Sequence, residues 1–299
     1  MQYIHFRRVH TSNKKGVKSM KIQIALNKDI DKAREIINNY FSNKKVEIEE
    51  IDYESRHLFN IAPVKNRSLK NFYNDVTKLI LDLILNIYSK DIIYKQIGTN
   101  FRNLKANEKM EVVEISKELL LDEENFTVEK EYINSQIKNY IMDIPFISVD
   151  GFMLFRLKGF NLFIDLVIDK GVEEYTVEKE YREFIKILKY FVEVQEPKYD
   201  LVNIVFEDEN YTLLDNNDNK IDNNFFEEVV EELDSVSISE DDLLISSLIV
   251  LSPKNIIIHL DEKNRERDVV KIIVDVFQDK VYFCLGCEKC KGKVKIKND

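Results

Sequence analysis

The sequence predicts an α+β protein with a small N-terminal βαβ unit, a predominantly helical middle and a C-terminal α/β unit that ends in a βαβ crossover. Three observations lead to this prediction. Apolar residues alternate in short segments within residues 20–62, helical periodicity dominates residues 68–196, and residues 199–290 change between short apolar strands and amphipathic helices. A hydrophobic content of 44% and a charged content of 33% are typical of a globular chain.

Residues 20–62 carry the N-terminal α/β unit. The segment "KIQIAL" alternates as a strand does, and a helix is expected from about Asp29 to Phe41 because its apolar residues share one helical face. "KVEIEEI" alternates again, and "HLFNIA" before Pro63 is a candidate third strand. Residues 1–19 are basic and lack apolar periodicity, which predicts either a disordered arm or a misassigned start upstream of Met20. We favour the second interpretation.

The helical region covers residues 68–196. Ser68 is the expected N-cap of a long helix that stops near Gly98, and shorter helices are expected around 107–121 and 127–143. Pro145 and the "DG" pair at 150–151 predict a break. A dense apolar segment, 152–175, is expected at the centre of the core, followed by an amphipathic helix that ends before Pro197.

The C-terminal unit is expected over residues 199–290, followed by a charged tail at 291–299. "LVNIVFEDENYTLL" and "DNNDNKI" predict strands joined by an Asn/Asp-rich turn, and a helix is expected at about 223–233. Ser239 and Asp242 form a capping-box pattern before a helix that Pro253 stops. "NIIIHL", a helix and "KVYFCL" then predict two parallel strands with a right-handed crossover.

Charge, hydrophobic pattern and missing motifs argue against several classes of function. The net charge of −10 and the absence of a lysine or arginine stripe disfavour nucleic-acid binding. No apolar run reaches the length of a membrane span, and no secretory signal pattern opens the chain, so a cytoplasmic protein is expected. P-loop, dinucleotide-binding and zinc-protease motifs are absent, and the carboxylates of "EKEYRE" are typical of a solvated helix face. The sequence therefore predicts no catalytic residue and favours a protein that is not an enzyme.

All three cysteines of the chain, Cys284, Cys287 and Cys290, stand in "CLGCEKC" near its end. Two overlapping C-x2-C steps place sulfurs on tight turns, where thiolates could bind one soft or borderline metal ion. A four-thiolate cluster within one chain is excluded because a fourth cysteine is missing.

His259 is the candidate fourth ligand. When "NIIIHL" is written above "KVYFCL" with Asn255 beside Lys280, His259 falls beside Cys284. If the two strands are parallel neighbours in this register, both side chains leave the same sheet face at the carboxyl ends of the strands. The sequence thus predicts a closed Cys3His site for structural zinc.

Other interpretations of these residues stay open. The thiols could exchange disulfides or hold an iron–sulfur cluster with one open iron position. Cys284 could equally be a small buried apolar residue, His259 a hydrogen-bonded core residue, and the remaining cysteines exposed free thiols.

The segments "FRLKGF" (155–160), "EKEYREFIKILKYFVEVQEPK" (178–198), "EDDLLISSLIVLSPKNIIIH" (240–259) and "CLGCEKC" (284–290) together resemble the YtxC-like family of putative sporulation proteins. The resemblance covers most of the chain from about Met20. It implies a setting in endospore-forming bacteria and protein partners in sporulating cells, but no reaction and no catalytic residues. The resulting hypothesis is a cytoplasmic binding or scaffold protein with a structural metal site at its C-terminal cysteines.

Overall fold

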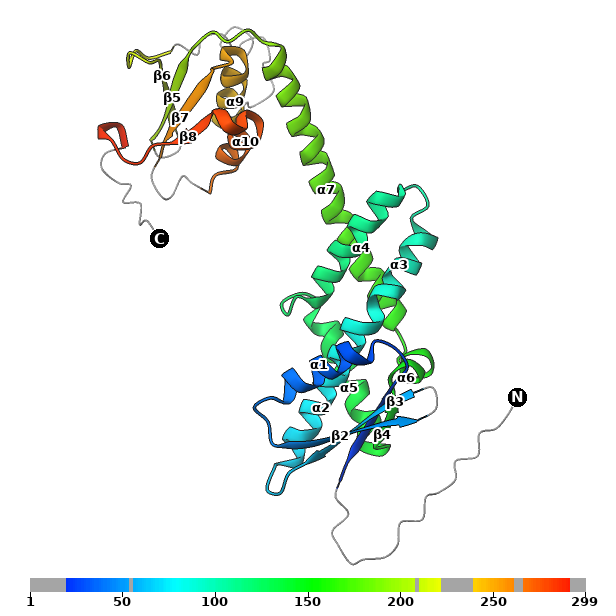
Figure 1. Ribbon diagram of the computed structural model, residues 1–299. Coiled ribbons are helices and arrows are strands. Elements are labelled where there is room, and N and C mark those ends of the chain that lie inside the picture. The colour runs from blue at the N-terminus through cyan, green and yellow to red at the C-terminus, as the bar shows by residue number, and fades with distance from the viewer. Residues whose placement is uncertain (1–19, 54–55, 208–209, 222–238, 261–265, 291–299) are drawn as a thin grey trace, which may run out of the picture. The chain divides into compact units, whose positions relative to one another are not determined.

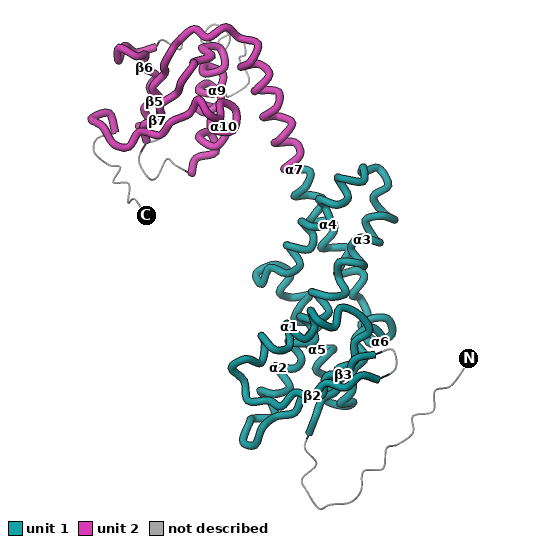
Figure 2. The backbone as a smooth tube through the Cα atoms, in the orientation of Figure 1, with its two compact units in different colours: residues 1–176 teal, residues 177–299 magenta. Residues whose placement is uncertain are grey.

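The structure is a computed structural model that describes residues 20–53, 56–207, 210–221, 239–260 and 266–290 (Figure 1). It divides into two compact units, residues 1–176 and 177–299, shown in different colours in Figure 2. We describe each unit by itself. The expected features at 1–19, 223–233 and 291–299 lie outside the described residues.

Unit 1 contains a mixed sheet with the strand order β2-β3-β1-β4. β3 is antiparallel to both β1 and β2, so β1 and β2 run the same way with β3 between them, while β4 is parallel to β1. The predicted βαβ unit is therefore present, with the third strand inserted between the other two. The elements are β1 (Ile22–Leu26), α1 (Ile30–Phe41), β2 (Val46–Tyr53), β3 (Arg56–Pro63) and β4 (Phe146–Ser148).

The helices of unit 1 share one core with this sheet. Phe59 of β3 and Phe72 of α2 are both fully buried in the same apolar cluster, which extends to Tyr175. The N-terminal strands and the following helices therefore form one packed body rather than separate cores. The helices are α2 (Leu69–Leu83), a π-helical turn (Ile84–Tyr88), α3 (Ser89–Asn100), α4 (Ala106–Leu121), α5 (Thr127–Asp143) and α6 (Val149–Phe155).

Several helix boundaries agree with the sequence and others differ. α4 and α5 match the expected ranges, but the first long helical segment continues past Gly98 to Asn100. Ser68 occupies the N-cap position without a side-chain capping hydrogen bond. The predicted break at Asp150 and Gly151 is wrong: both lie inside α6, where Asp150 accepts two hydrogen bonds from Arg56, of 2.8 and 3.0 Å.

α7 (Phe160–Val194) begins in unit 1 and ends in unit 2. From the sequence we expected the apolar segment and the amphipathic helix as two elements, but in the structure both belong to this one helix. Gly171 continues the helix between them and lies against α4. A Cβ atom built on Gly171 would come within 2.2 Å of Ser116 Oγ, so the missing side chain permits this close approach. The helix ends three residues before Pro197, as expected.

Unit 2 contains a second sheet with the order β6-β5-β7-β8. β5 is antiparallel to β6 and parallel to β7, and β7 is parallel to β8, which confirms the predicted pair of parallel strands. The capping box of Ser239 and Asp242 is also confirmed. The elements are β5 (Leu201–Glu207), β6 (Asn210–Leu214), α9 (Glu240–Leu251), β7 (Asn255–His259), α10 (Asp268–Phe277) and β8 (Val281–Phe283).

One face of this sheet is covered and the other carries polar and sulfur-containing side chains. Val202, Ile204, Ile256 and Ile258 pack with α9 and α10 in the core of unit 2. Because side chains alternate along a strand, Asn203 and His259 belong to the opposite face. Within the described part of the chain, no helix is long and apolar enough to cross a membrane.

Candidate metal centre

The site begins at the carboxyl ends of two neighbouring parallel strands. Ile256 pairs with Val281 and Ile258 with Phe283, so the register predicted from the sequence is confirmed and His259 stands level with Cys284. The backbone N–H of Cys284 continues the ladder by donating to the Ile258 carbonyl at 2.9 Å. Two ligand candidates, 25 positions apart by their numbers, thus emerge beside each other.

A short loop returns the other two cysteines to this point. Gly286 has a φ of 120°, a backbone conformation that favours glycine, and a 3-10 turn follows at Glu288–Cys290. The N–H of Cys290 donates to the Cys287 carbonyl at 3.1 Å, which closes the turn. The Cys287 and Cys290 sulfurs consequently lie 3.8 Å apart.

The four ligand atoms form a compact set. The Nδ1 atom of His259 lies 3.3 Å from Cys287 Sγ and 3.4 Å from Cys290 Sγ, and all four ligand atoms, Cys284 Sγ included, are within 4.8 Å of one another. A tetrahedral zinc ion with bonds of about 2.3 Å to sulfur and about 2.0 Å to nitrogen requires separations of roughly 3.8 Å and 3.5 Å respectively. The donor set therefore fits one tetrahedral ion.

Asn203 of β5 orients the imidazole. Its Oδ1 atom lies 3.0 Å from His259 Nε2, and its amide group donates to the Asp215 carbonyl at 3.2 Å. With the proton on Nε2, the lone pair of Nδ1 is directed at the sulfurs, as in metal sites where a second residue fixes the histidine tautomer. Burial lowers the pKa of His259, and nearby Lys289 lowers it further, which favours the neutral ligand form.

The thiols of the C-x2-C turn have different pKa shifts. Burial raises the pKa of Cys290 to about 11. Burial would also raise the pKa of Cys287, but hydrogen bonds from the backbone of Cys290 and Lys289 and from Cys284 outweigh it and lower that pKa. Cys287 therefore becomes the thiolate, the form that binds metals, more readily than Cys290 does.

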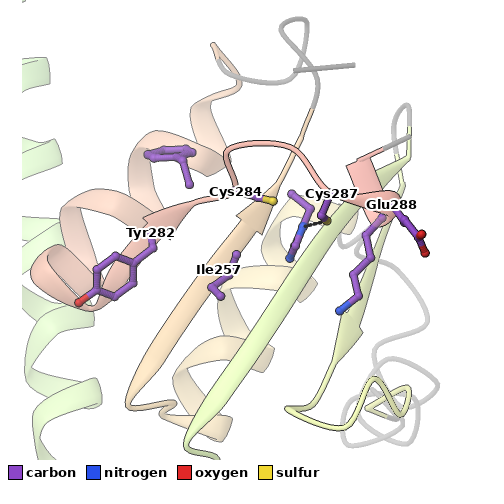
Figure 3. Close-up of a pocket in the computed structure, with 8 residues that line it drawn as sticks. Ile257, Tyr282, Cys284, Cys287 and Glu288 are labelled. Atoms are coloured by element: carbon purple, nitrogen blue, oxygen red, sulfur yellow. Dashed lines mark hydrogen bonds between the residues drawn. The ribbon is translucent and has the colours of Figure 1, made fainter. Parts of the chain in front are cut away.

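A pocket opens on the same sheet face. It is lined by His259, Cys284 and Cys287 together with Ile257, Tyr282, Phe283, Glu288 and Lys289. Figure 3 shows Cys284 and Cys287 at the two ends of one loop, with Ile257 below them and Tyr282 on the strand that leads to Cys284. Lys289 forms an ion pair with Asp218 and so fastens the cysteine loop to the turn after β6.

Sequence reasoning found the four ligand candidates but missed Asn203 and Lys289. A signal for Asn203 was present, because a polar residue within the apolar strand "LVNIVF" is unusual and its 4% exposure needs a hydrogen-bond partner. The pairing of β5 with β7, which brings it to His259, could not be read from composition. The "EKEYRE" carboxylates of Glu178 and Glu183 are solvent-exposed on α7, in agreement with the interpretation of a solvated face.

Comparisons with known proteins give the family. An uncharacterised protein named YtxC from Bacillus subtilis (strain 168) is 24% identical over 159 residues, which are 51% of this chain and 53% of that protein. An uncharacterised ABC transporter ATP-binding protein/permease of Acanthamoeba polyphaga mimivirus is 25% identical over 170 residues, 54% of this chain and 31% of that protein. The chain thus spans about half or less of the curated relatives it matches.

No solved structure matches this chain. The model of the YtxC-like family, however, matches residues 74–282, which is more than half of the sequence and includes parts of both units. The chain belongs to the YtxC-like family.

Proposed function

We propose that unit 2 binds one zinc ion through Cys284, Cys287, Cys290 and His259, and that the ion is structural. The observation that carries this proposal is that four ligand atoms from a strand end, a turn and a neighbouring strand lie within 4.8 Å of one another. Three thiolates and one neutral imidazole are a common ligand set for structural zinc. The hydrogen bond from His259 to Asn203 supplies the orientation such sites require.

The spacing favours a single ion over an iron–sulfur cluster. Ligands of one ion lie at most two bond lengths apart, about 4.6 Å for two sulfurs at 2.3 Å each. In a [4Fe–4S] cluster each cysteine binds a different iron atom, so the sulfurs are held farther apart than around one ion. The 3.8 Å between Cys287 Sγ and Cys290 Sγ is in the range for one shared ion.

Four protein ligands leave a zinc ion no open position for water or substrate, which supports a binding role rather than catalysis. The family resemblance supports a role in sporulation, and the free thiols are compatible with the reducing cytoplasm. We therefore infer a cytoplasmic, sporulation-associated binding or scaffold protein whose C-terminal unit is stabilised by zinc.

Thiol–disulfide exchange is the second candidate, favoured by the lowered pKa of Cys287 beside Cys290. In this reaction the Cys287 thiolate attacks a partner's disulfide. The Cys290 thiolate then attacks the mixed disulfide, which leaves a Cys287–Cys290 disulfide and a reduced partner dithiol.

Elemental analysis of the untagged full chain, purified without oxygen, tests the first proposal. We expect about one zinc per chain, lost in Cys287→Ser and retained in the matched control Glu288→Gln, which changes another residue of the pocket. If the protein instead contains iron and acid-labile sulfide, the site holds an iron–sulfur cluster and the zinc proposal is wrong. A metal-free protein whose thiol count falls by two on oxidation would support the exchange reaction instead.

A further inference from the structure

The part of α7 that belongs to unit 2 has apolar residues on two faces. Tyr181, Ile185, Leu188 and Val192 pack against the core of unit 2. A second stripe, which we name the α7 stripe, is exposed to solvent and lies outside that core. It consists of Phe184, Ile187, Tyr190, Phe191 and Val194, with exposed fractions from 44% to 62%.

The spacing of the α7 stripe is that of a helix-pairing seam. Phe184, Ile187, Phe191 and Val194 follow one another at steps of three, four and three residues, the alternation of a and d positions in a heptad. The α7 stripe is not needed to cover the core of unit 2, because the other apolar face of α7 already packs on α9, α10 and the sheet. The seam therefore points to another helix as the group that covers it.

The exposed area is large enough for a weak dimer. Aromatic side chains have about 150–250 Å² each, so the exposed fractions of the five residues amount to roughly 500 Å² per copy. Two copies would bury about 1,000 Å², which is the lower limit for a specific interface.

The α7 stripe is also complementary to itself. If two helices pair antiparallel about position 189, Phe184 faces Val194 of the other copy and Ile187 faces Phe191. Each layer then combines an aromatic ring with an aliphatic side chain, as well-packed cores do. Tyr190 approaches its own counterpart across the two-fold axis, which explains the fifth exposed residue. A parallel pairing would instead place Phe184 on Phe184 and Val194 on Val194.

We propose that the α7 stripe is the surface through which two copies of this chain associate, as an antiparallel helix pair with two-fold symmetry. The partner is a second copy because every residue of the stripe then finds a complementary residue within the same stripe.

Sedimentation velocity of the full chain between about 1 and 200 µM tests the association, with a concentration-dependent monomer–dimer equilibrium expected at this interface size. Ile187→Lys should weaken the dimer by at least about tenfold, since it puts a charge opposite Phe191 in two layers. Glu193→Lys introduces the same side chain at an exposed position of the helix that is turned away from the seam. It is the matched control and should leave the equilibrium unchanged. Circular dichroism checks that both variants remain folded.

Mixing variants tests the pairing direction. Ile187→Lys and Phe191→Glu chains should each be monomeric, and a mixture should form heterodimers, because an antiparallel pair brings the introduced lysine of one chain beside the introduced glutamate of the other. A wild-type monomer at every concentration overturns the proposal, as does a dimer that Ile187→Lys leaves intact. If the mixture stays monomeric, the antiparallel pairing is overturned.

Discussion

The two units differ in what closes their cores. Unit 1 buries a long series of apolar residues from a sheet and helices on a single contiguous core, with Phe59 and Phe72 fully enclosed. Unit 2 has a smaller cluster on one sheet face, and its opposite face carries the polar and sulfur-containing residues of the candidate metal centre. Metal binding adds to the free energy of folding where the ligands come together only in the folded state. If unit 2 binds the proposed zinc ion, we expect its stability to depend on that ion, whereas the stability of unit 1 should not.

Removal of the proposed zinc ion should give the largest difference in stability between the two units. We expect chelation, or Cys290→Ser, to destabilise unit 2 by several kcal/mol, since structural zinc contributes roughly 10–16 kcal/mol of binding free energy. Hydrogen exchange of the full chain, measured by mass spectrometry, should show faster exchange in β7 and β8 and unchanged exchange in β1 and β3. Equal acceleration in both sheets, or in neither, would contradict the difference between the units.

Asn203 provides a smaller change within unit 2. Asn203→Leu should weaken zinc affinity by about 10- to 100-fold, because His259 loses the acceptor that fixes its tautomer. Asn203→Asp keeps an acceptor and is the matched variant, expected to retain most of the affinity. Competition with a chromogenic chelator measures both. Equal affinities of the two variants would mean that Asn203 does not orient the histidine.

The contact between α4 and α7 tests unit 1. Gly171→Ala places a methyl group against Ser116, and we expect a net destabilisation of about 1–2 kcal/mol, since overpacking costs more than the helix gains from alanine. The double variant Gly171→Ala with Ser116→Gly should recover most of the loss. Chemical denaturation, monitored by hydrogen exchange in peptides of unit 1, gives the free energies of unfolding. A more stable single variant would show that the helices are not in close contact.

Asp150 gives the smallest expected effect. Burial alone would raise the pKa of Asp150, but hydrogen bonds from Ser148 and Arg56 lower it below its usual value. A lowered native pKa contributes stability above the unfolded value, near 3.9, and this contribution disappears as pH falls through the native pKa. The contribution should be less than about 1 kcal/mol because Arg56 is partly exposed. Between pH 7 and pH 3, Asp150→Asn should therefore lose slightly less stability in unit 1 than the wild type, and should leave the acid response of unit 2 unaltered.

The C-terminal strands show how much a sequence can predict. The register of β7 and β8 agrees with the one assumed when the two short apolar segments were aligned, and the crossover rule had already predicted that the two strands run parallel. The capping box of Ser239 was equally local. The bare presence of three clustered thiols identified the candidate ligands without any structure.

Other features depend on contacts between distant segments. The sequence did not predict β4, whose three residues pair with β1 only because the chain returns after more than a hundred residues. Nor did the sequence predict that α7 continues through Gly171, since the need for a glycine there depends on the close contact with Ser116 of another helix. Asn203 was missed for the same cause: its role depends on which strand lies beside β5.

The register of β7 and β8 has a consequence for how relatives can diverge. A single inserted residue between Val281 and Cys284 would turn Cys284 to the other face of the sheet and away from His259, because side chains alternate with every position. Insertions or deletions in the segment that connects β7 to β8 do not change which face of the sheet each strand residue points to. Among relatives that keep the site, we therefore expect gaps in the alignment to fall between the strands and to be missing from the few positions that precede each ligand.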